Sequence, residues 1–75
     1  MTPEFAEATI PTLVRALRER LQEALAKAKA AEVYLETADR DGAIEIMLDV
    51  EMPLGEAETL LNTIAIIQRR ARSCP

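Results

Sequence analysis

The chain has 75 residues with a formal net charge of −4, one cysteine and no histidine. A chain of this length forms one small domain that buries only roughly 60% of its unfolded surface, so it usually needs a disulfide, a metal or a second chain for stability. The single cysteine excludes a disulfide within the chain, and the lack of histidine argues against a zinc site. We therefore expect no metal and no cofactor. Association with another chain is the one source of additional stability that remains.

The first residues predict the start of a helix. The string TPE at residues 2–4 combines a capping hydroxyl, a proline for the first helical position and an acid near the positive end of the helix dipole. Pro11 leaves two alternatives, because proline is tolerated only in the first turn of a helix. Either a short helix ends near Thr9, or Pro11 opens the main helix, which we place at about residues 11–38.

This helix carries apolar residues in a heptad pattern, at alternating spacings of four and three residues. The stripe consists of Ile10, Val14, Leu17, Leu21, Ala24, Ala28, Ala31 and Leu35. Leu13 and Leu25 widen it. Such a stripe is either the core of a single chain or a coiled-coil seam between two chains, and both interpretations stay open.

Residues 37–42, TADRDG, interrupt the helical pattern with turn-forming residues, and Gly42 is the candidate for a positive φ that stops the helix. The next stretch, AIEIMLDVEM at 43–52, has the two-residue period of a half-buried strand, which would need a strand from another chain. As a helix it would end before Pro53, because the residue before a proline avoids the α region. We predict a connector over 39–54 whose apolar part is helical, with the strand as the alternative.

The last predicted helix spans about residues 55–72. Acidic residues occupy its first turn and arginines its last, so both ends complement the helix dipole. Its apolar stripe consists of Ala57, Leu60, Ile64, Ile67 and Ala71. Leu61 lies about 100° to one side of this stripe, and Ile66 lies about 120° to the other side. A helix that is apolar on so many sides indicates a second interface.

Together, these elements predict an all-α fold, an antiparallel helical hairpin with a short apolar connecting segment at 43–52. The alternative is an α-β-α arrangement in which the 43–52 strand pairs between chains. The residues expected in the core seam are Val14, Leu17, Leu21, Ala28, Leu60, Ile64 and Ile67. Those expected to contact a partner are Leu61, Ile66, Ile46 and Val50.

Charge is distributed unevenly along the chain. Residues 15–29 hold five basic and two acidic residues, whereas residues 32–58 hold nine acidic residues and one basic residue. Nucleic acid is a poor candidate partner, because its binding requires a basic face and often stacking aromatics, and the chain has only Phe5 and Tyr34. The acidic centre is either ordinary solvated surface or a tip that orients a basic partner.

Catalytic chemistry has few candidate residues. There is no histidine for acid–base catalysis, and two glycines cannot form a phosphate-binding loop. We therefore expect no enzyme, and we expect the thiol of Cys74, in a polar tail, to be incidental. The N-terminus lacks the basic start and apolar run of a signal peptide, and no apolar run approaches about 18 residues. We expect a cytoplasmic protein that does not bind membranes.

Two stretches, RALRERLQEALAKAK at 15–29 and AETLLNTIAIIQRR at 57–70, resemble the small co-chaperones of type III secretion needle subunits, the helical-hairpin E-protein family. The start MTPE fits loosely, and about 30 of the 75 residues carry the resemblance. It implies a cytoplasmic helical hairpin that binds a helical-repeat chaperone and helps to keep the needle subunit monomeric. The competing hypothesis is a homodimeric structural or regulatory helical protein, either a four-helix dimer or one joined through residues 43–52.

Overall fold

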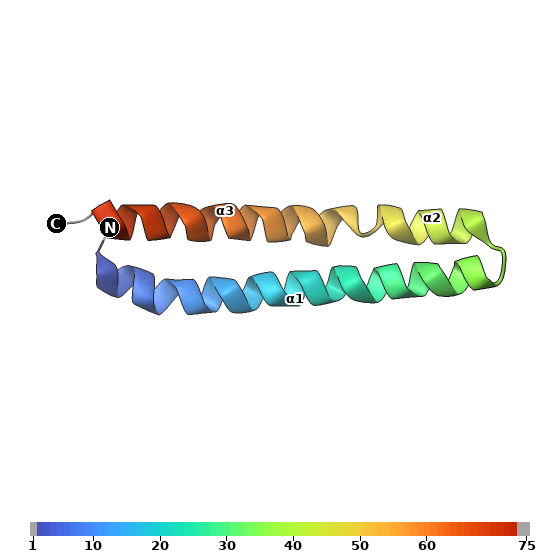
Figure 1. Ribbon diagram of the computed structural model, residues 1–75, viewed down its shortest axis with the longest axis horizontal. Helices are drawn as coiled ribbons and strands as arrows, with labels where there is room; N and C mark the ends of the chain where they lie inside the picture. Colours follow the sequence, from blue (N-terminus) through green and yellow to red (C-terminus); the bar gives the residue numbers. More distant parts are fainter. Residues whose placement is uncertain (1, 74–75) are drawn as a thin grey trace.

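The computed structural model describes residues 2–73, so the expectation for Cys74 lies outside the described residues. The chain is an antiparallel helical hairpin, as predicted. One arm is α1 (Pro3–Glu36), and the other is formed by α2 (Arg40–Leu48) followed in line by α3 (Glu51–Ser73). Figure 1 shows both arms side by side, with the two ends of the chain at the same end of a rod that measures 59 × 14 × 12 Å.

The helix start predicted at residues 2–4 is confirmed, but the helix continues through Pro11, so α1 is longer than the main helix predicted at about residues 11–38. Thr2 caps it, because its hydroxyl accepts a hydrogen bond from the Phe5 N–H at 3.2 Å. Pro11 has no N–H and therefore removes one hydrogen bond from the helix interior. The first turns are nevertheless helical, and Ala6 is buried. Both alternatives predicted for Pro11 are therefore wrong: the helix neither ends before Pro11 nor starts at it.

The reversal of the chain after α1 is made by Ala38 and not by a glycine. Ala38 has a φ of 61°, in the left-handed region, while no described glycine has a positive φ. The Ala38 N–H donates to the Leu35 carbonyl at 3.0 Å, and the Asp39 N–H donates to the Tyr34 carbonyl at 2.9 Å. These bonds satisfy the last carbonyls of α1 and offset the strain of a non-glycine residue in this region. Gly42 instead lies in the first turn of α2.

The alternating segment at 43–52 is helical, and the described residues contain no strand. Asp39 caps α2 by accepting a hydrogen bond from the Gly42 N–H at 2.9 Å. Ala43 of α2 and Val50, in the turn that follows α2, lie seven residues apart and are both buried, with exposed fractions of 3% and 6%. Burial at helical spacing therefore outweighs the two-residue period of the apolar side chains.

The connector was predicted to extend to residue 54, but α3 already begins at Glu51. Between α2 and α3, the Asp49 and Val50 N–H groups donate to carbonyls three residues earlier, at 3.0 and 3.1 Å. Pro53 then falls in the first turn of α3, where a missing N–H loses no helical bond. The proline therefore starts the last helix, whereas the prediction had it end the preceding segment.

The core of the hairpin is small. Besides Pro53, seven apolar residues of the described part of the chain are buried, and five of them are alanines: Ala6, Ala24, Ala31, Ala43, Val50, Ala57 and Ile67. Alanines allow the two arms to approach closely, but each removes little apolar surface from water. Most of the large apolar side chains therefore lie at or near the surface of the rod.

Compared with the predicted stripe, α1 is rotated. Five of the eight expected members are buried or half-buried: Ile10, Leu17, Ala24, Ala28 and Ala31. Among the other three, Val14 and Leu21 were expected in the core but are 48% and 47% exposed. The positions one residue earlier, Leu13 and Arg20, are half-buried in their place, as is Lys27. The hydrocarbon stems of arginine and lysine can occupy such positions while the charged group stays in water.

The remaining members of the expected seam lie on or beside the contact between the arms. Ile67 is buried, and Ala28, Leu60 and Ile64 are half-buried. The apolar stripe of the last helix therefore faces α1, while that of the first helix is divided between the core and the surface.

Candidate partner-binding surfaces

The hairpin exposes far more large apolar residues than it buries. Fourteen such residues of the described chain are at least 42% exposed, against two large residues, Val50 and Ile67, among the buried apolar ones. Isolated apolar residues on a surface are normal, so their arrangement decides whether they form a site.

One side of the hairpin is defined by a groove between the arms. Ala16 of α1 lines this groove together with Met52 and Thr59 of α3. Residues seven apart on a helix lie at nearly the same angle, so Ile66, seven residues after Thr59, lies along the same flank of α3. We call this surface the groove side.

The opposite side carries the opposite flanks of both arms. On α1 these flanking positions are Val14, Leu21 and Leu25, and on α3 they are Leu54 and Leu61. Their exposed fractions run from 47% to 55%. We call these five residues the apolar side.

The apolar residues of this side also lie at matching heights along the rod. An ion pair between Arg20 and Glu56 places these two residues opposite each other in the antiparallel arms. Counting from that pair, Leu61 lies level with Val14, and Leu54 lies level with the turn that holds Leu21. The apolar side is therefore one strip that crosses from arm to arm.

The structure does not bring the four predicted partner residues together. Leu61 lies on the apolar side and is 55% exposed, whereas Ile66 lies on the groove side and is 43% exposed. Ile46 is half-buried. Val50 is only 6% exposed because it packs within its own chain, so it offers no surface to a partner.

The groove side contains two adjoining hollows. The larger, of about 730 Å³, is lined by Ala16, Arg20, Glu51, Met52, Gly55, Glu56, Thr59 and Leu60. The smaller, of about 470 Å³, is lined by Lys27, Leu48, Asp49, Glu51 and Met52. Glu51 and Met52 line both, so the two hollows adjoin each other along this side of the rod.

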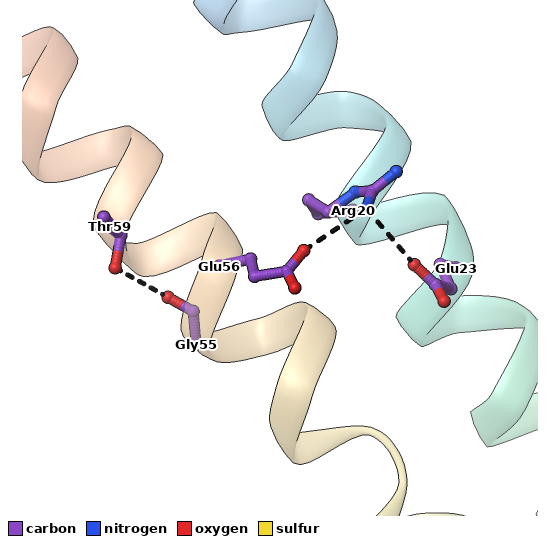
Figure 2. A network of polar contacts seen from close by, with 5 residues as sticks. All are labelled: Arg20, Glu23, Gly55, Glu56 and Thr59. Carbon is purple, nitrogen blue, oxygen red and sulfur yellow. Dashed lines mark hydrogen bonds and ion pairs between the residues drawn. The ribbon is translucent and has the colours of Figure 1, made fainter.

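One ion pair, between Arg20 and Glu56, joins the two arms beside the larger hollow. Figure 2 shows the Arg20 guanidinium between Glu56 of α3, at 3.2 Å, and Glu23 of α1, at 3.8 Å. The Thr59 hydroxyl donates to the Gly55 carbonyl at 3.1 Å. The Arg20 side chain is 37% exposed and that of Glu56 is 47% exposed, so solvent screens the pair and its contribution to stability is at most about 1 kcal/mol. The pair marks which residues of the two arms lie opposite each other.

Residues 2–73 contain no group of three histidine, cysteine, aspartate or glutamate side chains that could hold a metal ion. Within the same residues, no helix is both long and apolar enough to cross a membrane. Comparisons of the chain with protein-family models, with curated proteins and with solved structures find no match. The surfaces described above therefore carry the functional argument.

Apart from Leu60, which was expected in the core seam, sequence reasoning did not single out the residues that line the larger hollow. Met52 was part of the alternating segment, and Gly55 was only a residue near a helix start. The larger hollow joins Ala16 and Arg20 to residues more than thirty positions later in the chain. No local pattern could identify it, because it depends on the register of the two arms.

Proposed function

We propose that the chain is a non-catalytic protein–protein interaction module whose apolar side is covered by a second protein. This proposal rests on one observation. Arg20 and Lys27 of α1 occupy half-buried positions beside the other arm, while Val14 and Leu21, at apolar heptad positions, are exposed. In a self-contained hairpin, a rotation that buried both of these side chains would be favoured by the hydrophobic effect. A partner that covers the apolar side makes the observed rotation favourable.

The area involved suits a moderate interface. Full burial of a leucine or valine is worth about 1.5–3 kcal/mol, so removing the remaining half of one such side chain from water contributes about 1 kcal/mol. Five residues of the apolar side would contribute about 5 kcal/mol before the entropy of association is subtracted. Stable binding therefore requires a partner that also contacts the surrounding polar residues.

Within this class we propose a cytoplasmic co-chaperone that stabilises the complex between a type III secretion needle subunit and its helical-repeat chaperone. The helical-hairpin fold and the resemblance of residues 15–29 and 57–70 to that family support the proposal. A stack of helical repeats has an extended concave surface, and a long rod of two paired helices suits it. Binding would stabilise both proteins by mass action.

The test is a pull-down of the tagged chain from its native host, with the co-purifying chains identified by mass. Leu61→Asp places a charge on the apolar side, and Ile66→Asp makes the same kind of change on the groove side as a matched control. We expect a helical-repeat chaperone and a small needle-like protein with the unmodified chain and with Ile66→Asp. We expect both to be lost with Leu61→Asp while circular dichroism shows unchanged helix content.

The proposal fails if Leu61→Asp recovers these proteins as well as the unmodified chain does. It also fails if the unmodified chain recovers only itself at twice its mass. That second result would favour the homodimeric candidate, because two apolar sides placed face to face would form a four-helix dimer. Sedimentation at micromolar concentration separates the two candidates, since a monomer excludes the homodimer.

A further inference from the structure

The groove side is a second surface of the hairpin, separate from the apolar side. We propose that it binds a basic amphipathic helix of another protein. In this complex an apolar side chain of that helix lies over Gly55 beside Met52, and its lysine or arginine residues lie beside Glu51 and Asp49. The inference is independent of the co-chaperone proposal, which uses the opposite side of the rod.

The apolar residues that line the two hollows are unusually exposed. Met52 is 72% exposed and Leu48 is 65% exposed, the two highest values among the large apolar side chains of the described residues. Both line the smaller hollow, and Met52 also lines the larger one. Methionine adapts its shape to different apolar groups and is common on surfaces that bind amphipathic helices. The most exposed apolar groups of the chain therefore gather in one concave place.

Gly55 lines the larger hollow and has open space beside it. A Cβ atom at Gly55 would meet no atom within 4 Å, so neither packing nor backbone conformation within the hairpin requires glycine there. Glycine in a helix is unfavourable relative to alanine. In this position it leaves the backbone of α3 uncovered and gives an incoming side chain room to approach it closely.

The linings of the two hollows hold more acidic than basic side chains. Asp49, Glu51 and Glu56 contribute three carboxylates to the two hollows, against Arg20 and Lys27. Arg20 already contacts two carboxylates, those of Glu56 and Glu23. Glu51 and Asp49 form no ion pair within residues 2–73. Cationic groups on the bound segment would complement these two carboxylates, whereas an acidic segment would be repelled.

A direct test uses the full chain, labelled with ¹⁵N and with ¹³C methyl groups, and two synthetic helical peptides of about 18 residues, roughly five helical turns. Both peptides carry leucines at positions i, i+3, i+4 and i+7, and their polar faces carry either lysine or glutamate. We expect the lysine peptide to shift the signals of the Gly55 amide and the Met52 methyl group in a saturable way. We expect little response to the glutamate peptide.

Three variants locate the binding. Gly55→Leu adds a large side chain where a Cβ atom meets no neighbour, so it should occupy the larger hollow without disturbing the hairpin. We expect this variant to lose the signal shifts caused by the lysine peptide, while circular dichroism should show that the chain is still helical. Glu51→Lys reverses one carboxylate and should weaken binding by about fivefold or more at low salt. Leu61→Asp changes the apolar side and should leave the affinity for the lysine peptide unaltered. The same variant is expected to lose the binding of the helical-repeat chaperone.

The inference is overturned if the lysine peptide causes no saturable shift at Gly55 and Met52. It is equally overturned if both peptides bind alike, or if Gly55→Leu binds as well as the unmodified chain. Sedimentation could also reveal a homodimer that Gly55→Leu dissociates. This result would show that a second copy of the chain occupies the groove, and it would contradict the inference. Loss of the shifts in Leu61→Asp would place the peptide on the apolar side and refute the inference in the same way.

Discussion

The two glycines of the chain both lie near the start of a helix, and replacing each by alanine should change stability in opposite directions. Gly42 is the third residue of α2, and Gly55 is the fifth residue of α3. A Cβ atom at Gly42 would lie 2.6 Å from Asp39 Oδ2 and 2.8 Å from Tyr34 Cδ1, whereas one at Gly55 would meet nothing within 4 Å. The contrast isolates the effect of packing, since the chemical change is the same.

At Gly55 only the helix propensity changes, and alanine is favoured over glycine by about 1 kcal/mol. At Gly42 the same gain is opposed by two losses. Asp39 must move away, which disrupts a cap worth about 1 kcal/mol, because its other oxygen accepts the hydrogen bond from the Gly42 N–H. The Tyr34 ring must also leave its rotamer, at about 0.5–1.5 kcal/mol. Gly42→Ala should therefore be destabilising by about 1 kcal/mol.

The assay is thermal unfolding followed by circular dichroism, with all variants at one concentration because self-association would shift Tm. The two variants should differ by about 2 kcal/mol, which corresponds to roughly 8–16 °C in Tm for a domain of this size. In an Asp39→Ala background the cap is already absent, so Gly42→Ala should be much less harmful. Equal shifts for Gly42→Ala and Gly55→Ala, or the same effect of Gly42→Ala in both backgrounds, would refute the reasoning.

Three further predictions concern the helix interiors and the contact between the arms. Pro11→Ala should raise the free energy of unfolding by roughly 1–3 kcal/mol in urea titrations, since Pro11 is exposed and removes a hydrogen bond from the interior of α1; a lower midpoint would contradict this. Ile67→Ala should lower it by about 2–5 kcal/mol, whereas Ile66→Ala, next to it but 43% exposed, should change it by less than about 1 kcal/mol; equal losses would show that the rotation of α3 is wrong. Glu56→Gln should lower it by less than about 1 kcal/mol and lose even that effect at high salt; a loss above about 2 kcal/mol would mean that Arg20 depends on this partner far more than an exposed pair does.

The hairpin itself could be predicted from the sequence, because both arms have helical periodicity and a cluster of turn residues separates them. The strand-like period at 43–52 was misleading in isolation, since the cap at Asp39 and the burial of Ala43 and Val50 act only once α1 is present to pack against. The helix start at Pro3 was predictable from its cap, but its continuation through Pro11 was not. Local signals thus predicted the elements better than their boundaries.

The surfaces were less predictable than the fold. A heptad stripe identifies apolar residues but not which of two neighbouring positions faces the other arm. In α1 the half-buried positions include Arg20 and Lys27, which any hydrophobic pattern rejects, while Leu21 is 47% exposed. Leu61 was correctly expected to be exposed, since it lies off its stripe. Its position on the flank opposite Ile66 follows from the geometry of the last helix alone. Which of the two flanks borders the groove follows only from the antiparallel pairing of the arms.

The interruption at Asp49 and Val50 also divides the rod into two units that can open separately. α2 packs on α1 across the turn end, and regular i to i−4 hydrogen bonding does not run from α2 into α3, because the Asp49 and Val50 N–H groups bond three residues back. Separation of α2 from α1 would expose little beyond Ala31, Ala43 and Val50, while the contact of α1 with α3 around Ile67 stays closed. The free energy of such a local opening is smaller than that of global unfolding. Amides near the turn would therefore exchange with solvent many times in the lifetime of a single folded molecule.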